Sequence, residues 1–449
     1  MQVSANTAPA EISAKPGLPA LSQSRFARFA AIILLYSMQG VPVGLTLVAL
    51  PAWLAANGAG PVAVGAFVGT ALLPWSLKLF GGLLMDRFTY RPMGRRRVWI
   101  LAAQALMACV LISLALAAPG PTQIGQLAMF CFVLNACAVF NDVATDGMTV
   151  DLVPLEERTT INGLMFAAQW LGVAVSGFIA GQFLASDAMT SVGFTLAGLV
   201  IVVSTFIALF RERPGERRMP WSTGSASAEC EARQQEAWWP ILKGIFRSVR
   251  VPATLLFLIG GGLSQVTYAF VDAIAPTLAV QQLGWASDAY SRFASLAGFS
   301  MGIAGALAAP VFVKLVGLRN ALIGVCLGLS SCAFAAGATY GNWETSGLFM
   351  AIYWIQLFLA TALVVVCVVW AMRICNPAIA ASLFALFMAA PNFGRSIMSG
   401  WSGVVVETVG YSGTYFAVAA VSLIGLGVML LARFGDERTA AHLQDNQNA

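Results

Sequence analysis

The chain alternates between long apolar stretches and short polar connections. Twelve such stretches occur, at roughly 29–56, 62–85, 98–118, 124–150, 160–184, 190–210, 252–281, 289–316, 319–340, 345–373, 378–406 and 411–433. An α-helix needs about 20 apolar residues to cross the hydrocarbon core of a bilayer, and every stretch reaches that length. The pattern therefore predicts an all-α membrane protein with about twelve transmembrane helices.

The composition supports a surface that faces lipid. Of the 449 residues, 59% are hydrophobic and 10% are charged, whereas soluble proteins carry about 25% charged residues. The net charge of +5 does not indicate nucleic-acid binding, because the basic residues are concentrated in particular connections.

The positions of these basic residues predict the orientation in the membrane. The connection 86–97 holds five arginines, and the long central connection 211–250 holds eight lysines and arginines. The connections 57–61 and 119–123, by contrast, carry no charge. Because basic loops stay in the cytoplasm, we expect both termini to be cytoplasmic.

The central connection divides the chain into two halves of six helices. We expect a disordered cytoplasmic N-terminus over 1–28, a first six-helix bundle over 29–210, and a second over 251–434. The cytoplasmic linker 211–250 contains a short basic amphipathic stretch typical of a membrane surface. A cytoplasmic tail follows over 435–449.

One motif follows the second apolar stretch. Gly82 and Asp86 have the spacing Gly-x-x-x-Asp, and basic residues follow at Arg87, Arg95 and Arg96. The motif resembles the loop between the second and third helices of major facilitator transporters. This resemblance implies a cytoplasmic gate in which the aspartate pairs with basic groups and releases them when the halves move. The alternative is that these arginines only set the topology.

Three charged residues lie inside apolar stretches of the first half. Asp142 and Asp146 are one turn apart on one helix face. Counting back from the helix ends places Lys78 and Asp142 roughly 10–12 Å deep. A bare charge at that depth is costly, so we expect Lys78 and Asp142 to pair. The pair either breaks and re-forms during transport or is static and structural.

A narrower resemblance rests on three segments. These are Gln39-Gly-Val-Pro-Val-Gly-Leu45, Leu73-Pro-Trp-Ser-Leu-Lys78, and Asp142 to Asp146 followed by Asp151-Leu-Val-Pro-Leu-Glu-Glu-Arg158. Over about 36–177 the chain resembles muropeptide permeases and their relatives, the rhizobactin- and pyochelin-type siderophore permeases and the acetyl-CoA transporters. The resemblance implies the major facilitator fold and inward, proton-driven transport. Typical muropeptide permeases carry two additional helices, for which this sequence has no room, whereas the siderophore-type relatives have about twelve.

Six amide side chains fall near the middle of the membrane. Four lie in the first, fourth, seventh and tenth helices, which line the central cavity in the resembled fold, and two lie at similar depth in the fifth and eleventh. Because amides both donate and accept hydrogen bonds, they suit a solute rich in hydroxyl, amide or carboxylate groups. The alternative is hydrogen bonding between helices. The six are Gln39, Asn135, Gln265, Gln356, Gln169 and Asn392.

Arg395 is the most conspicuous charge of the second half. It lies deep in the eleventh stretch, where an arginine faces a cavity or a counter-ion. We expect it to bind an anionic part of the solute; the alternative is a pair with Asp272 or Glu407. For proton coupling, Asp272 beside Pro276 is the first candidate, Asp142 the second and Asp146 the third.

These features predict a secondary transporter that takes up an amphipathic or anionic organic solute, siderophore-like or muropeptide-like. Its expected partners are the inner-membrane bilayer, the solute and protons, with no nucleic acid, and the protein is expected to be a monomer. The alternatives are a proton-driven exporter, a passive channel, or a non-transporting assembly or sensor protein on the same fold. An enzyme is not expected, nor are a cofactor or a metal. The single histidine, His442, lies in the polar tail, and the eight cysteines lack metal-ligand spacing.

Overall fold

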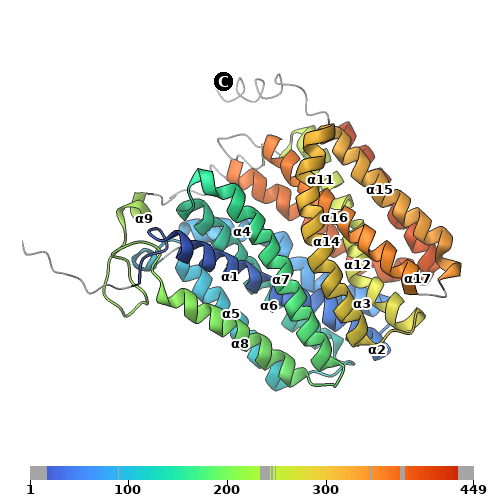
Figure 1. The fold of residues 1–449 in the computed structure, drawn as a ribbon, viewed down its shortest axis with the longest axis horizontal. Coiled ribbons are helices and arrows are strands. Elements are labelled where there is room, and N and C mark those ends of the chain that lie inside the picture. The colour runs from blue at the N-terminus through green and yellow to red at the C-terminus, as the bar shows by residue number, and fades with distance from the viewer. Residues whose placement is uncertain are drawn as a thin grey trace, which may run out of the picture.

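The computed structural model of the chain describes residues 18–432 apart from Thr89, 233–242, 244–245, Ser248, 344–345 and 375–379. Its helices form two bundles that lie side by side, the N-terminal bundle in blue to green and the C-terminal bundle in yellow to red (Figure 1). Within the described residues all regular structure is helical, which confirms the predicted fold class. The predicted N-terminus at 1–17, the tail beyond residue 432 and most of the amphipathic stretch lie outside the described residues.

The N-terminal bundle contains six spans, the first beginning four residues earlier than expected. In chain order its elements are α1 (Arg25–Gly44), η1 (Leu45–Ala49), α2 (Leu50–Ala56), α3 (Pro61–Leu72), η2 (Leu73–Leu77), α4 (Lys78–Arg87), η3 (Arg91–Met93), α5 (Arg97–Ala117), α6 (Ile124–Leu152), η4 (Leu155–Glu157), α7 (Arg158–Leu184) and α8 (Met189–Leu209). The short helix α9 (Ala228–Ala232) follows in the central connection.

The C-terminal bundle repeats this plan. Its elements are α11 (Pro252–Leu263), α12 (Val266–Ala273), α13 (Ala275–Thr277), η5 (Leu278–Gln282), α14 (Ser287–Val316), α15 (Leu318–Thr339), η6 (Tyr340–Asn342), α16 (Ser346–Ile374) and α17 (Ala380–Leu431). Eleven helical segments among the described residues are long and apolar enough to span a membrane. The last of them is two helices joined at Gly410, whose φ of 71° breaks the helical path. The segments therefore provide twelve spans.

The first span of each bundle is interrupted in its second half. In the first, the π-helical turn η1 follows Pro42 and Gly44. In the seventh, the π-helical turn η5 follows Pro276. Proline removes a backbone donor and disturbs the helix around it, and π-turns inside helices are frequent at functional sites. Pro391 does not interrupt its helix in this way, because the one non-helical residue of α17 is Gly410.

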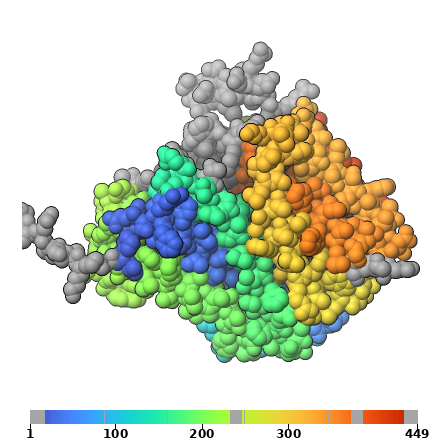
Figure 2. Space-filling model, in the orientation of Figure 1, coloured from blue at the N-terminus to red at the C-terminus, as the bar shows by residue number. Residues whose placement is uncertain are grey.

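The two bundles meet along two seams. One joins α3 to α17 and the other joins α7 to α14; Figure 2 shows the second, where green α7 adjoins gold α14. Small residues line both seams. A Cβ on Gly69 would lie 2.8 Å from the Gly400 backbone, and a Cβ on Gly181 would collide with Ser291. Glycine at these positions lets the helices approach closely.

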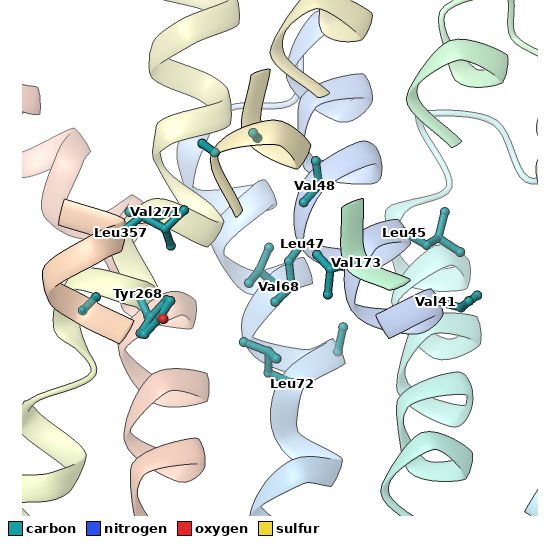
Figure 3. Packing of buried hydrophobic residues seen from close by; sticks show 14 of the residues in the cluster. Val41, Leu45, Leu47, Val48, Val68, Leu72, Val173, Tyr268, Val271 and Leu357 are labelled. Atoms are coloured by element: carbon teal, nitrogen blue, oxygen red, sulfur yellow. The ribbon is translucent and has the colours of Figure 1, made fainter. Parts of the chain in front are cut away.

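Further contacts join the bundles near the end of the first and seventh spans. Gln281 of η5 donates from Nε2 to the carbonyl oxygens of Ala55 and Ala59, each at 2.9 Å. Buried apolar residues fill the space between the seams. Figure 3 shows part of this layer, with Val48, Val68 and Val173 on N-terminal elements and Val271 and Leu357 on C-terminal ones. The halves are therefore packed together on the side opposite the basic connections.

Candidate functional site

The side chain of Arg395 contacts one short helix within the C-terminal bundle. Arg395 of α17 donates from Nε to Oδ2 of Asp272 at 2.6 Å. Its guanidinium carbon also lies 4.5 Å from the ring centroid of Tyr268. Tyr268 and Asp272 are one turn apart on α12, so this helix contacts both the edge and the face of the guanidinium. The Asp272 pair is one of the two alternatives that the sequence left open for Arg395.

The ring of Tyr268 is itself held in place. Its hydroxyl lies 2.6 Å from Oγ1 of Thr361 on α16, where either atom can donate. Arg395 keeps 20% of its side chain exposed. Its two Nη atoms form no hydrogen bond with any described residue, and they form the fork that binds carboxylates in a bidentate manner. The guanidinium is thus oriented by α12 while its outer donors stay available.

A second charged cluster lies in the N-terminal bundle. The ammonium of Lys78, at the start of α4, forms ion pairs with Asp142 and with Asp146 of α6, the latter at 3.2 Å. Tyr36 of α1 donates its hydroxyl to Oδ1 of Asp146. Three helices of the bundle, α1, α4 and α6, therefore contribute to one charged cluster.

The two carboxylates differ in access. The side chain of Asp142 is 5% exposed, whereas that of Asp146 is 40% exposed. One ammonium cannot neutralise two carboxylates, so the ionised cluster carries one net negative charge. The excess charge is accessible at Asp146, because Asp142 is enclosed. The structure thus places the expected Lys78–Asp142 pair and adds Asp146 and Tyr36 to it.

The four amides predicted for the cavity helices are all buried. Both ends of the Asn135 amide have hydrogen-bond partners, since its oxygen accepts from Trp75 Nε1 at 2.9 Å and its nitrogen donates to Thr46 at 3.2 Å. Gln39 and Gln356 each bury an Nε2 group without a hydrogen-bond partner among the described residues. Unpaired buried donors are costly and mark places where a water or a ligand can bind. The Gln265 side chain donates from Nε2 to the hydroxyl of its neighbour, Ser264, at 3.4 Å.

The other two amides are partly buried. Gln169 donates to Gln39 Oε1 at 3.5 Å, which is a weak hydrogen bond. Asn392 donates to the carbonyl oxygen of Met388 in its own helix. Because this hydrogen bond lies within one helix and already uses the amide donor, Asn392 is the weaker candidate for binding a solute.

The predicted gate residues lie at the basic end of the N-terminal bundle. Arg95 Nη1 and Arg96 Nε lie 3.6 and 3.7 Å from Oδ2 of Asp151. Arg87 lies over the ring of Phe88. A Cβ on Gly82 would make ordinary contact with Val143. The side chain of Asp86 lies outside those described, so its pairing stays a prediction.

Three contributors were missed by the sequence reasoning. Thr361 is hydrogen-bonded to the Tyr268 hydroxyl, and Trp75 donates a hydrogen bond to the Asn135 side chain. Glu212 accepts hydrogen bonds from the backbone N–H groups of Arg96 and Arg97 at 3.1 and 3.3 Å. A tyrosine and an aspartate four residues apart on an apolar helix could have indicated the Arg395 site. No sequence pattern places Glu212 beside the start of α5, because 115 residues separate it from Arg97.

Comparison with known proteins identifies the family. Residues 32–328 match the sequence model of the Major Facilitator Superfamily. The chain is also similar to the anhydromuropeptide permease of Escherichia coli strain K12. The two are 26% identical over 419 residues, which cover 90% of this chain and 80% of the permease.

The fold is similar to those of solved transporters. A D-xylose–proton symporter superposes with a TM-score of 0.68 at 15% identity and covers 91% of this chain and 97% of its own. A bacterial homologue of the human lysosomal transporter Spinster gives the same TM-score at 12% identity, over 91% of this chain and 96% of its own. At these identities the likeness supports the fold alone.

Proposed function

Because this chain belongs to the Major Facilitator Superfamily, we propose that it takes up an anionic or amphipathic organic solute by proton-coupled alternating access. A multi-pass membrane transporter, rather than an enzyme, is the common ground of the family match, the permease relative and the fold. The proposal adds coupling to protons, the inward direction of transport and the class of solute.

The ion pair between Arg395 and Asp272 carries this proposal. At 2.6 Å the aspartate occupies one edge of the guanidinium. A proton on Asp272 removes that counter-charge and leaves Arg395 to bind an anion in its place. Since a buried cation needs a partner, proton binding favours solute binding. Release of the solute favours release of the proton, because Arg395 then needs the ionised Asp272 again. This exchange is the linkage that a symporter requires.

The cluster around Lys78 supplies a second proton-binding candidate. Asp146 is the accessible member, and its proton would be exchanged while Lys78 stays paired with Asp142. Because α1, α4 and α6 all contribute, a change in charge there alters the packing of three helices. We assign Asp272 the coupling role first, then Asp142 and Asp146.

The nature of the solute is inferred from the groups around these charges. The free donors of Gln39 and Gln356 suit carbonyl, hydroxyl or carboxylate oxygens. The relative in Escherichia coli is named for anhydromuropeptides, and the sequence also resembles siderophore permeases. We therefore propose a siderophore-like or muropeptide-like solute, with Gln169 and Gln265 as further contacts and Asn392 as a weaker one.

The basic connections give the proposed placement in the cell. We propose that the protein is a monomer in the inner membrane, with both termini and the linker 211–250 in the cytoplasm. On this orientation, Gly82, Asp86, Arg87, Arg95 and Arg96 form the cytoplasmic gate, and the packed seams close the outer side.

Uptake into liposomes tests this function. Purified protein is given an inward proton gradient and is offered an anhydro-muropeptide and, in parallel, a panel of ferric siderophores. We expect one class to accumulate, to stop accumulating when the gradient is dissipated, and to lose at least tenfold in uptake in Arg395→Ala. Asp272→Asn mimics the protonated state, so it should keep exchange of solute and lose gradient-driven accumulation.

The control is Arg25→Ala, which breaks an Arg–Glu pair with 67% of the arginine exposed at the start of α1; it should transport normally. Accumulation that survives Arg395→Ala would remove the proposed site. Efflux driven by the reversed gradient, with no uptake, would establish an exporter instead.

A further inference from the structure

The connection after α8 folds against the basic end of the N-terminal bundle. We call residues 210–232 the cap loop; its helix α9 lies at the end of the bundle, away from the C-terminal half (Figure 1). Backbone bonds join it to two other segments. Leu21 N–H donates to Arg211 O at 2.9 Å, and Arg217 N–H donates to Pro92 O at 2.6 Å. The cap loop therefore ties together the beginnings of the first and third spans and the end of the sixth.

Two fully buried carboxylates lie inside this loop. Glu212 is well provided with partners: the N–H groups of Arg96 and Arg97 donate to Oε2, and Arg213 Nη1 lies 3.4 Å from Oε1. It caps the N-terminus of α5, where a negative charge is stabilised by the helix dipole. Gly94, at a φ of 96°, leaves the space that Glu212 fills, since a Cβ there would collide with the carboxylate.

Glu216 has a different environment. Its Oε2 accepts from the Arg213 N–H at 2.8 Å, and its Oε1 lies 2.8 Å from the hydroxyl of Ser227. Both partners are neutral, and a serine hydroxyl can either donate or accept. The contacts therefore survive when Glu216 is protonated, and this one side chain joins the beginning of the cap loop to its end.

Burial, together with a neighbouring carboxylate, favours the neutral form of Glu216. Burial and the neighbouring Glu212 raise the pKa of Glu216 to about 7, against the lowering effects of Ser227 and Arg213. The buried guanidinium of Arg97 on α5 is a further cation that interacts with Glu216. Burial also raises the pKa of Glu212, with Asp151 adding to it, while Arg213 and the N–H donors of Arg96 and Arg97 lower it. Closing the loop around two carboxylates thus favours a proton on the one with neutral partners.

We propose that the cap loop is an acid-tightened latch, in which a proton on Glu216 holds residues 210–232 closed and its release loosens them. The direction follows from linkage. Between the ordinary pKa of 4.5 and about 7, the closed loop binds a proton that the open loop lacks. Opening therefore becomes up to about tenfold more favourable per pH unit as pH rises through this window, and then levels off above about 7.

The latch responds to protons on the side of the membrane where the basic connections lie. Protons that arrive there with a solute would tighten the cap and stiffen the helix ends that it joins. The inference stands on the loop alone, and its test needs no transported solute.

Cys230 provides the test within the loop itself. Its thiol is buried, and Sγ lies 3.8 Å from Arg91 O. Burial raises its pKa to about 11; Glu212 and Glu216 add to this, while Arg213 and Arg95 oppose it. A thiol reagent reaches Cys230 only when the cap loop opens, so the labelling rate measures opening.

The experiment uses full-length protein in detergent with the other seven cysteines replaced by serine or alanine. Maleimide labelling is followed from about pH 5.5 to 8. Thiolate formation alone raises the rate about tenfold per pH unit, and opening of the latch multiplies this by up to about tenfold more below pH 7. We expect the excess in the parent protein and in Glu229→Gln, an exposed control on α9, but not in Glu216→Gln.

Either of two results would overturn the latch. If the labelling rate of the parent protein rises with pH only as steeply as thiolate formation requires, opening of the cap loop does not depend on pH. If the excess persists in Glu216→Gln, the proton belongs to another group, such as Glu212. Hydrogen exchange of residues 213–231 in the unmodified protein, corrected for intrinsic rates, gives a check that needs no variant. Protection there should increase as pH falls from about 7 to 5.5, and constant protection would also contradict the proposal.

Discussion

At the scale of single residues, Lys78 and Arg395 each lie beside a carboxylate of their own bundle. Lys78 pairs with Asp142 and Asp146 within the N-terminal half, and Arg395 pairs with Asp272 within the C-terminal half. Removing one partner of such a pair leaves a charge that lipid and packed protein cannot solvate. These residues therefore support the structure as well as the proposed transport.

Lys78→Met should expose this structural role. It leaves Asp142 enclosed without its counter-charge, and loss of one partner from a buried pair costs about 3–5 kcal/mol. We expect a clear drop in the thermal unfolding midpoint in detergent. Adding Asp142→Asn to Lys78→Met should recover most of the loss, because a neutral amide replaces the stranded carboxylate. A double variant as unstable as the single one would show that the Asp142 pair is not the cause.

At the scale of the helices, the two seams depend on small side chains. Gly69 lies against the Gly400 backbone, and Gly177 and Gly181 lie against Ser295 and Ser291. A larger side chain at these positions meets backbone or a packed helix, so the seam must open to admit it. The bundles themselves can stay intact, since the clash lies between them.

Gly69→Leu should therefore shift the protein towards a state that is open at the packed end. Spin labels on Thr122 and Gly341, in connections of opposite bundles, should report a longer distance by double electron–electron resonance. Gly198→Leu is the matched control, because a Cβ on Gly198 of α8 meets nothing within 4 Å. An unchanged distance in Gly69→Leu, with normal folding, would argue against the seam as the closing element.

The helices also show where sequence reasoning succeeds and fails. Spans follow from apolar length, and the Lys78–Asp142 pair follows from equal depth, since both depend on local sequence and lipid. The partner of Arg395 stayed open, because depth does not tell which of two carboxylates faces it. The twelfth span was found together with its junction, because the apolar stretches end at 406 and resume at 411, and the helical path breaks at Gly410 between them.

The cap loop could not be predicted either. Its bonds connect residues more than a hundred positions apart, as in Arg97 Nη1 to Arg218 O at 2.6 Å. Charge and proline content made 211–250 look like a plain linker. Tertiary packing decides the structure of such a segment, and the local sequence pattern does not display it.

At the scale of the whole molecule, the basic connections all emerge from one end of the two bundles. The α9 segment and the 86–97 connection lie together at that end, through the hydrogen bond of Cys230 to Arg91. Fusions at the two termini and in an uncharged connection test the proposed orientation. Green fluorescent protein on either terminus should fluoresce, and alkaline phosphatase inserted at 119–123 should be active. Active phosphatase at the C-terminus would reverse the topology.

The packed end has a consequence for the surroundings in which the protein can work. Among the described residues, its cross-bundle contacts include glycine packing, the bonds of Gln281 to two backbone carbonyls, and a hydrogen bond from Arg292 Nη1 to Gln182 Oε1 at 3.5 Å. None of these is an ion pair. Dissolved salt weakens attraction between exposed charges but hardly affects such contacts. On the proposed orientation this end faces the medium, whose salinity can vary widely. Closure there would be as firm in fresh water as in brine, while the ionic end is kept within the regulated salinity of the cell.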